Sequence, residues 1–366
     1  MRAVLAPLVA LSATMVLSSV GAATPSEQVD DGWTIDQAET YEITALTGSQ
    51  SSNRTDLRWG VWGTDLGSMF EHRGRIYQLF GDTFDTGQTD WRSNVMAWSN
   101  DPDPTNGLQF DGMITDRPGH AKELIHNDDV PGDEITVIPT YGVSVNNRMF
   151  IHYMAVNFWG PPGEWTLNQS GLAYSDDDGQ NWTVSDVAWP GDSNFGQAAI
   201  VEVGQYVYFM GIPGGRFGHA ELARVKRTDL LNMDAYRYWD GSAWVSDPDA
   251  AATVLPAPVA ELSIRWNSHY GKWILMTKHQ QRNDSGFAIV VRIADCLAGP
   301  WSDEQWVFTN QDVHRPYGPY MPPRWNDGPD IYFTVSKFFP IYNVFWWHTT
   351  LDGVERGTKP ARCVSG

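Results

Sequence analysis

Two aspartates stand at equal distances from the centre of one short segment, residues 63–84, which reads GTDLGSMFEHRGRIYQLFGDTF. The pattern predicts a β-hairpin with its turn at Arg73-Gly74, so that Asp65 lies opposite Asp82. Directly opposite residues of an antiparallel pair point to the same face, with Cβ atoms about 4.5–5.5 Å apart. We therefore expect two neighbouring carboxylates. A β-bulge would change their register but leave both at one end of the hairpin.

A close pair of carboxylates is unfavourable for structure alone, because each charge raises the cost of ionising the other. Chemistry that needs one acid and one base favours such a pair, as glycoside hydrolysis does. The glycines beside the aspartates, Gly63, Gly67 and Gly81, allow tight turns and close approach of a ligand. The alternative is two ordinary turn aspartates, since Asp beside Gly is common in loops.

Two further charged residues are candidates for the same site. Glu261 opens a predicted strand in the way that Asp65 does, so it could orient substrate or replace Asp82 as the acid. The structural alternative for Glu261 is a salt bridge with Arg265 or another neighbour. Arg216, in the glycine-rich stretch PGGRFG, could donate hydrogen bonds to a substrate, or simply belong to a connection between strands.

Aromatic and amide side chains occur near the starts of other predicted strands, at positions that correspond to that of Asp65. Sugars present flat C–H faces and many hydroxyls, which aromatic rings and phenol or amide groups can contact. Each such residue could equally be a packing residue. The candidate substrate contacts are Trp62, Tyr141, Gln197, Tyr317 and Tyr320.

Short β-type runs separated by Gly and Pro dominate the chain, and helix signals are scarce. Five stretches share one pattern of two apolar strands around a polar turn. Degenerate repeats of this kind predict an all-β fold, a closed five-bladed β-propeller forming one domain over residues 24–366. The last repeat lacks a fourth strand, and ETYEITALT, residues 39–47, is the candidate to supply it. The repeats are anchored at Asp65, Gly142, Gly196, Glu261 and Gly318.

Two acidic turns have mainly structural interpretations. SDDDGQNW, residues 175–182, is an Asp-box, in which the acid caps backbone amides while Trp182 packs between strands. Asp101 and Asp103 have a spacing found in calcium loops. They also occupy the turn that the Asp-box fills in the next repeat, and a structural turn is the favoured interpretation.

The chain of 366 residues carries a formal charge of −19, from 25 Lys and Arg against 44 Asp and Glu. Such a surface repels phosphate backbones, so nucleic acid is excluded as a partner and a neutral substrate is favoured. The nine histidines show no zinc-enzyme pattern, and we expect neither a metal nor another cofactor. The expected protein is a monomer.

Residues 1–23 have one Arg, an apolar run and small residues before the break, which is typical of a cleavable secretory signal peptide. No other stretch is apolar enough to span a bilayer, so we expect a secreted protein without a membrane span after cleavage. In an exported chain Cys296 and Cys363 could pair, but their spacing does not decide this.

Segment 63–84 resembles the signature of glycoside hydrolase family 183, formerly the domain-of-unknown-function 4185 family, through GTDLG and FGDT. The resemblance covers about residues 60 to 350. Other stretches similar to the family pattern follow in order: GIPGGRFGHAELARV, ELSIRWNSHYGKWILM, CLAGPWS and YGPYMPPRW…IYFTVSKFFPIYNVFWWHTTL.

The resemblance implies a five-bladed propeller that cuts internal D-arabinofuranosyl linkages in cell-wall arabinan of the arabinogalactan and lipoarabinomannan type. It also implies catalytic roles for Asp65 and Asp82, which we assign as base and general acid with inversion expected. Two alternatives stay open, a carbohydrate-binding propeller without catalysis and a five-bladed glycosidase of other furanoside specificity. A binding module has no need of facing carboxylates, and substrate tests separate the specificities.

Overall fold

The computed structural model describes residues 32–355 except residue 131 and residues 283–285. The predicted signal peptide, residues 1–23, lies outside the described residues. So does Cys363, and with it the question of whether Cys363 pairs with Cys296.

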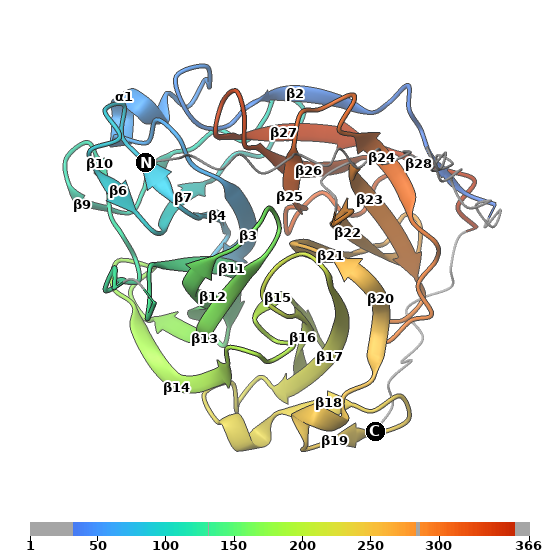
Figure 1. Cartoon of the computed structure of the whole chain (residues 1–366). Coiled ribbons are helices and arrows are strands. Elements are labelled where there is room, and N and C mark those ends of the chain that lie inside the picture. The colour runs from blue at the N-terminus through green and yellow to red at the C-terminus, as the bar shows by residue number, and fades with distance from the viewer. Residues whose placement is uncertain (1–31, 131, 283–285, 356–366) are drawn as a thin grey trace, which may run out of the picture. The chain divides into compact units, whose positions relative to one another are not determined.

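Five antiparallel sheets stand around a common centre, each contributing its first strand to the inside of the ring (Figure 1). These innermost strands are β3 (Leu66–His72), β11 (Thr136–Val145), β15 (Gln197–Val203), β21 (Leu262–Asn267) and β25 (Pro316–Tyr320). Each contacts the next, and β25 contacts β3, so the ring is closed. The prediction of a five-bladed β-propeller is confirmed.

The outer strands of each blade follow the innermost one. Blade one continues with β4 (Arg75–Phe80), β7 (Val95–Ser99) and β8 (Gly112–Met113). Blade two continues with β12 (Arg148–Trp159), β13 (Trp165–Ser175) and β14 (Thr183–Pro190). Blade three continues with β16 (Tyr206–Ile212), β17 (Gly218–Lys226), β18 (Arg237–Trp239) and β19 (Trp244–Val245), and β20 (Thr253–Val259) also pairs with β17. Blade four continues with β22 (Lys272–Gln280), β23 (Phe287–Ala294) and β24 (Gln305–Thr309).

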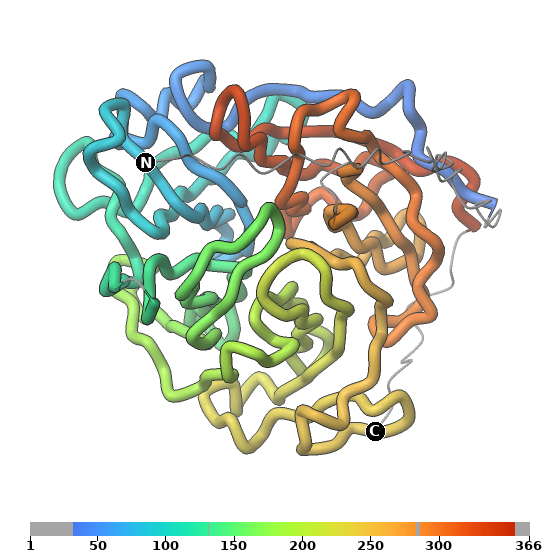
Figure 2. The backbone as a smooth tube through the Cα atoms, viewed as in Figure 1, coloured from blue at the N-terminus to red at the C-terminus, as the bar shows by residue number. Residues whose placement is uncertain are grey.

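Blade five is completed by the N-terminal part of the chain. After β25 come β26 (Ile331–Lys337) and β27 (Asn343–Thr349), and the fourth strand is β2 (Tyr41–Ala45). Strand β2 pairs with β27 from Tyr41 opposite His348 to Ala45 opposite Phe345. The start and end of the described chain run side by side along this blade (Figure 2). The expected closure by residues 39–47 is confirmed.

Short strand pairs and helices lie outside the five main sheets. Three short pairs join β1 (Thr34–Ile35) to β28 (Leu351–Asp352), β5 (Thr83–Phe84) to β6 (Trp91–Arg92), and β9 (Thr115–Arg117) to β10 (His120–Ala121). The helices are α1 (Thr55–Trp59) and the 3-10 turns η1 (Met233–Ala235) and η2 (Pro248–Ala250).

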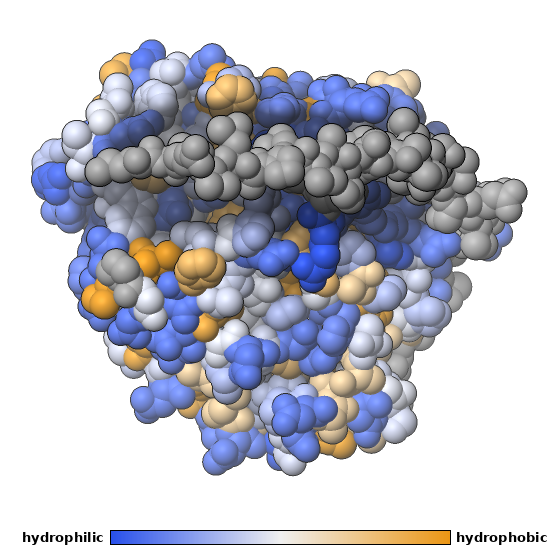
Figure 3. Space-filling model, in the orientation of Figure 1, coloured by the Kyte–Doolittle hydropathy of each residue, from blue (hydrophilic) through white to orange (hydrophobic). Residues whose placement is uncertain are grey.

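The apolar strands form the core because a blade is covered on both faces by its neighbours. Middle strands such as β23 and β27 are therefore apolar almost throughout and buried over nearly their whole length, instead of alternating. On the face shown in Figure 3, hydrophilic residues predominate and hydrophobic ones form small separate groups. Within the described residues, no helix is long and apolar enough to cross a membrane.

The two acidic turns have the expected structural roles. In the Asp-box, Asp177 accepts hydrogen bonds from Ser175 Oγ and the Asn181 backbone N–H, and Trp182 Nε1 donates to the Gly179 carbonyl. Asp101 and Asp103 likewise accept backbone N–H groups of their own loop. Both loops are therefore hydrogen-bonded turns between the third and fourth strands of a blade.

Candidate active site

A cavity of about 400 Å³ receives side chains from all five blades. Asp65 and Asp82 come from blade one, and Glu261 from blade four. Of the remaining predicted residues, Arg216 and Tyr317 also line it. Its other wall residues are Leu66, Ile138, Met154, Trp159, Gly160, Pro161, Pro162, Gly163, Glu164, Trp165, Lys278, Gln280, Phe287, Arg315, Phe338 and Tyr342.

The hairpin that carries the two aspartates differs from the simple register by one residue. His72 pairs with Arg75 and Ser68 with Leu79, as a turn at Arg73-Gly74 requires. A bulge then follows, and Leu66 pairs with Phe80. Asp65 is thus hydrogen-bonded to Gly81 through the backbone, and the predicted direct opposition of Asp65 and Asp82 is wrong. Both carboxylates still lie at the same end of the blade and line the same cavity.

The bulge is built from two residues with positive φ. Leu66 has φ of 65° and Gly67 has φ of 117°. A left-handed conformation is strained for a leucine, and such strain persists only where the surroundings hold it. Here Ser336 Oγ accepts the Leu66 N–H at 2.8 Å and donates to the Leu66 carbonyl at 3.2 Å. Blade five therefore fixes the backbone that presents Asp65.

Asp65 lies among groups that act on its charge. Tyr317 donates a hydrogen bond to Oδ2 at 2.8 Å, while Oδ1 is buried without a hydrogen bond among the described residues. Burial raises the pKa of Asp65 to about 7, and the negative charge of Asp82 adds to the rise. The phenols of Tyr342 and Tyr317 oppose the rise by stabilising the carboxylate. Asp65 is thus poised to hold or release a proton near neutral pH.

Asp82 is held by two donors that meet the same oxygen. Thr136 Oγ1 donates to Oδ1 at 2.8 Å and Trp91 Nε1 donates to Oδ1 at 3.0 Å. Burial raises the pKa of Asp82 to about 6, and the hydrogen bonds from Thr136 and Trp91 limit that rise. Asp82 is therefore the more acidic member of the pair.

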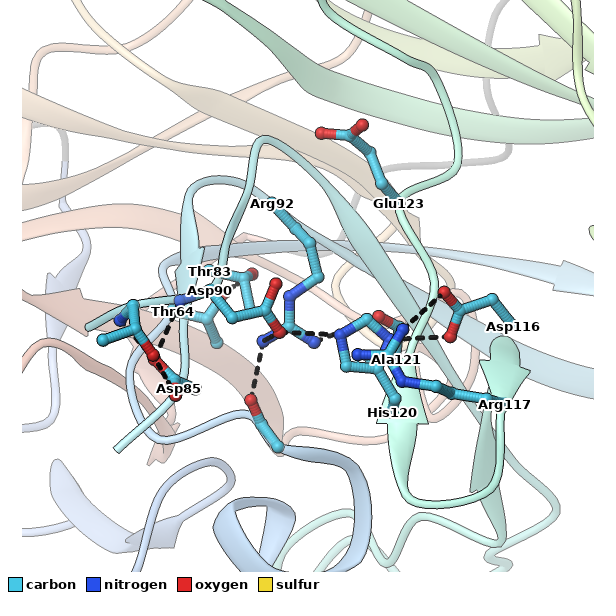
Figure 4. A network of polar contacts seen from close by, with 12 residues as sticks. Thr64, Thr83, Asp85, Asp90, Arg92, Asp116, Arg117, His120, Ala121 and Glu123 are labelled. Carbon is cyan, nitrogen blue, oxygen red and sulfur yellow. Dashed lines mark hydrogen bonds and ion pairs between the residues drawn. The ribbon is translucent and has the colours of Figure 1, made fainter. Parts of the chain in front are cut away.

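A polar network fixes the segment that carries Trp91. His120 bonds Asp116 through Nδ1 and Asp90 through Nε2, each at 2.6 Å (Figure 4). On the other side of Trp91, the guanidinium of Arg92 donates to two backbone carbonyls. Since Asp90 and Arg92 are the immediate neighbours of Trp91, the indole is held in place to reach Asp82.

Glu261 forms an ion pair with Arg216 rather than with Arg265. The distances are 2.6 Å from Nη2 and 3.0 Å from Nε, both to Oε1 of Glu261. Burial alone would raise the pKa of Glu261, but Arg216 and the Lys278 ammonium outweigh burial, so the pKa lies below its usual range. Glu261 is therefore ionised in the resting site, which does not suit a general acid.

The structure does not bring four of the predicted substrate contacts to the cavity wall. Tyr141 and Tyr320 are buried in the centre of the ring, with their ring centroids 6.2 Å apart. Gln197 donates from its amide to the carbonyls of the loop preceding Arg216. Trp62 is half-buried and lies outside the cavity lining. These four side chains pack against other residues or hold a neighbouring loop. The sequence pattern placed each of them near the end of a strand, but it does not determine where the side chain points.

The sequence did not predict several residues of this site. Tyr342, Trp165 and Gln280 line the cavity, and Trp91 and Thr136 bind Asp82. Tyr342 belongs to the apolar stretch IYNVFWW, and nothing in that stretch distinguishes a cavity residue from a core residue. Only the packing of neighbouring blades separates the two.

The arrangement supplies a proton donor and a proton acceptor in one partly closed cavity. The two carboxyl groups, with pKa values raised to about 6 and about 7, are each partly protonated near neutral pH. Arg216 and Glu261, which line the same cavity, form an ion pair, so each charge has a partner. This set suits general acid–base chemistry on an uncharged substrate.

Solved structures share this fold at low sequence identity. A Bacteroides ovatus protein matches 80% of this chain and 86% of its own, with a TM-score of 0.56 and 13% identity. An exo-β-1,3-galactanase from Phanerochaete chrysosporium matches 85% of this chain and 64% of its own, with a TM-score of 0.53 and 11% identity. At these identities the likeness concerns the fold.

Two fungal relatives are similar in sequence over most of their length. Notoamide biosynthesis cluster protein J of Aspergillus sp. (strain MF297-2) is 32% identical over 315 residues, which cover 78% of this chain and 82% of the relative. Protein J′ of Aspergillus versicolor is 31% identical over 307 residues, covering 77% and 82%. A family model matches residues 50–348. The chain therefore belongs to the family described as Domain of unknown function (DUF4185).

Proposed function

We propose that this protein is a glycoside hydrolase in which Asp65 and Asp82 form the acid–base pair. The observation that carries the proposal is their position in one cavity with pKa values raised to about 7 and about 6. In such a reaction one carboxylic acid protonates the glycosidic oxygen as the C–O bond breaks. The other carboxylate removes a proton from water as its oxygen bonds to the anomeric carbon, and both carboxyl groups return to their resting state after proton exchange.

We propose the reverse of the roles expected from the sequence, with Asp65 as general acid and Asp82 as base. Asp65 has the higher pKa and retains the shared proton longer as pH rises, which suits the general acid. Asp82 ionises first, which suits the base that activates water. Inversion remains the proposed stereochemical course, and the anomer released first identifies it.

The proposed substrate is an internal D-arabinofuranosyl linkage of cell-wall arabinan. Its support is the motif resemblance of segment 63–84 together with the family membership. The exo-β-1,3-galactanase of the same fold acts, by its name, on a galactan, which is consistent with a glycosidase in this architecture. The fungal relatives are named for a biosynthetic cluster, and their names state no reaction. Secretion through the N-terminal segment is part of this proposal.

The test is digestion of purified mycobacterial-type arabinogalactan by the wild type and by the Asp65→Asn and Asp82→Asn variants. Chromatography of released oligosaccharides should show D-arabino-oligosaccharides for the wild type and a loss of about 10²–10⁴-fold for either variant. Asp85→Asn, a neighbour outside the cavity lining, is the matched control and should remain active. Plant L-arabinan and a fructan test the alternative furanoside specificities.

Chemical rescue separates the two roles. An aryl oligo-arabinoside with a good leaving group does not need protonation, so it should restore much of the rate of Asp65→Asn but not of Asp82→Asn. Azide should accelerate Asp82→Asn by replacing the activated water. Binding of arabinogalactan without cleavage of any polymer would instead identify a carbohydrate-binding propeller and overturn the proposed function.

A further inference from the structure

Two of the exposed aromatic side chains line the active-site cavity. Trp159 is 44% exposed and Phe338 is 58% exposed, so both are open to a ligand in the cavity. Each has an aromatic neighbour in the sequence that does not line the cavity, Phe158 at 62% exposed and Phe339 at 61%. Single exposed apolar residues are normal on a surface, but exposed aromatic rings in the wall of a cavity are typical of ligand contacts.

The strand register fixes the direction of Trp159. It is the last residue of β12 and pairs with Trp165, the first residue of β13. Directly opposite residues of an antiparallel pair point to the same face, while successive residues point to opposite faces. Trp159 and Trp165 therefore share the face that lines the cavity, with ring centroids 5.6 Å apart. Phe158 lies on the other face, which explains why it is outside the cavity lining.

Phe338 stands one ring away from Asp65. It directly follows β26 of blade five, and its ring packs edge-on against Tyr342 with centroids 6.0 Å apart. Tyr342 lines the cavity, and its phenol stabilises the Asp65 carboxylate. Phe339 packs edge-on against His314 instead, with ring centroids 5.9 Å apart, and both of these residues lie outside the cavity lining.

The two aromatic residues come from the two blades that flank the acid pair. Strand β3 of blade one, which carries both aspartates, contacts β11 of blade two and β25 of blade five. Trp159 belongs to blade two and Phe338 to blade five. The cavity of about 400 Å³ is in the range of sites for drug-sized ligands, which are larger than one sugar ring. A ligand that contacts both aromatic residues therefore extends past the acid pair in two directions.

We propose that Trp159 and Phe338 are platforms for sugar units on the two sides of the acid pair, beyond the two units that the cleaved linkage joins. The proposal rests on the proposed function for the class of ligand. Sugar units suit these residues because their flat C–H faces pack on aromatic rings. Since both platforms are filled only by a chain of several units, they select long chains over short oligosaccharides.

The variants that test the platforms remove one exposed ring at a time. Trp159→Ala and Phe338→Ala remove the platforms, while Trp159→Phe and Phe338→Tyr keep an aromatic ring at each position. Phe158→Ala and Phe339→Ala are the matched controls, because each removes a comparably exposed ring from the neighbouring position without changing the cavity lining. Thermal unfolding shows whether each variant folds.

Two readouts compare long and short substrates. In Trp159→Ala and in Phe338→Ala, kcat/KM on arabinan should fall about tenfold, mainly through KM. On the shortest oligosaccharide that the wild type cuts, kcat/KM should hardly change. In an Asp65→Asn background, which slows turnover, calorimetry should show a similar loss of affinity for long arabinan-derived oligosaccharides. The ring-keeping variants should retain most of that affinity, and the two controls should behave like the wild type.

The outcomes separate this inference from the proposed function. If the wild type cuts arabinan and both platform variants behave like Phe158→Ala and Phe339→Ala, the platforms are overturned while the hydrolase stands. If the wild type binds long oligosaccharides without cutting them and both platform variants weaken that binding, the platforms stand and the hydrolase is overturned. A wild type that binds none of the saccharides overturns both.

Two further outcomes also overturn the platforms. A loss in only one of the two variants, or an equal loss on short and long substrates, contradicts sugar units on both sides of the acid pair. A dimer in sedimentation experiments that both Trp159→Ala and Phe338→Ala abolish would identify a second copy of this chain as the occupant of the aromatic surface.

Discussion

Asp65 and Asp82 differ in what surrounds them, although they share a cavity. Burial and the negative charge of Asp82 raise the pKa of Asp65, and the hydrogen bond from Tyr317 only partly opposes this rise. Asp82 accepts two hydrogen bonds on one oxygen from Thr136 and Trp91. The two carboxyl groups therefore titrate as a coupled pair, with pKa values raised to about 6 and about 7.

These pKa values predict a narrow bell-shaped pH profile. The value of kcat/KM on arabinan should rise as Asp82 ionises through about pH 6 and fall as Asp65 ionises through about pH 7. Its maximum should lie between these values. Initial rates across pH 4–9 at constant ionic strength measure the profile, and a rate that stays level above pH 7 would exclude Asp65 as the acid.

The raised pKa of Asp65 also predicts a pH-dependent stability effect. Its folded pKa of about 7 exceeds the ordinary value of 3.8, so the folded state binds more protons between these pH values and stability falls as pH rises. Asp65→Asn removes this penalty. The variant should unfold about 2–5 °C above the wild type at pH 8 and close to it at pH 3.5, as measured by calorimetry.

Asp85→Asn is the control with the opposite sign. The backbone N–H groups of Asp90 and Thr89 and the Thr89 hydroxyl hold the pKa of Asp85 below its usual value of 3.8. A lowered folded pKa contributes stability above that value and loses it as pH falls. Asp85→Asn should therefore lower the unfolding temperature at pH 8. If Asp85→Asn instead raised the unfolding temperature as much as Asp65→Asn, the stabilisation would come from removing any negative charge from this acidic protein.

At the scale of the hairpin, one bulge and one glycine position the Asp65 carboxylate relative to Asp82. The bulge at Leu66–Gly67 shifts Asp65 by one position, so its backbone meets Gly81 instead of Asp82. A Cβ at Gly81 would lie 2.5 Å from Asp65 Oδ1, which explains why the residue between the strand end and Asp82 is a glycine. The Asp65 carboxylate keeps its place only because position 81 has no side chain.

Gly81→Ala should therefore fold but displace the Asp65 carboxylate. Misplacement of a catalytic group by a fraction of an ångström predicts a loss of about 10–100-fold in kcat/KM on arabinan. Gly87→Ala is the matched control, because a Cβ there meets other atoms only at 3.4 Å or more. Equal activity of both variants would show that the cavity absorbs the added methyl group.

At the scale of the whole molecule, the site exists only when the ring is closed. The cavity wall combines Asp65 of blade one, Trp165 of blade two, Arg216 of blade three, Glu261 of blade four and Tyr317 of blade five. Blade five is completed by β2, which pairs with the buried strand β27. The N-terminal strand thus supports a site to which it contributes no wall residue.

Thr44→Pro should weaken this closure. Thr44 pairs with Trp346, and two residues further along β2 the Leu46 N–H donates to the Val344 carbonyl. Because backbone direction repeats every two residues, the Thr44 N–H also faces β27. Proline has no N–H to donate there. We expect a loss of about 1–2 kcal/mol and an unfolding temperature lower by several degrees, measured by calorimetry. Thr44→Val keeps the N–H and the side-chain volume and should unfold like the wild type.

Much of this architecture was predictable from local signals. Strand composition, turn residues and the repeated pattern predicted five blades, and the unpaired last repeat predicted the closing strand. Asp65 and Glu261 were found because each directly precedes an innermost strand, and those strand starts meet at one end of the ring. These features depend on short-range patterns repeated along the chain, which a sequence displays directly.

The tertiary structure decided the rest. The bulge that changes the Asp65 register depends on Ser336 from another blade, and the partner of Glu261 is Arg216 from a third. The order of the two carboxylate pKa values depends on burial and on donors distant in sequence. The sequence by itself determined which residues could react. Side-chain direction and electrostatic environment arise only when blades pack, so the structure alone decided which residues meet and in which protonation state.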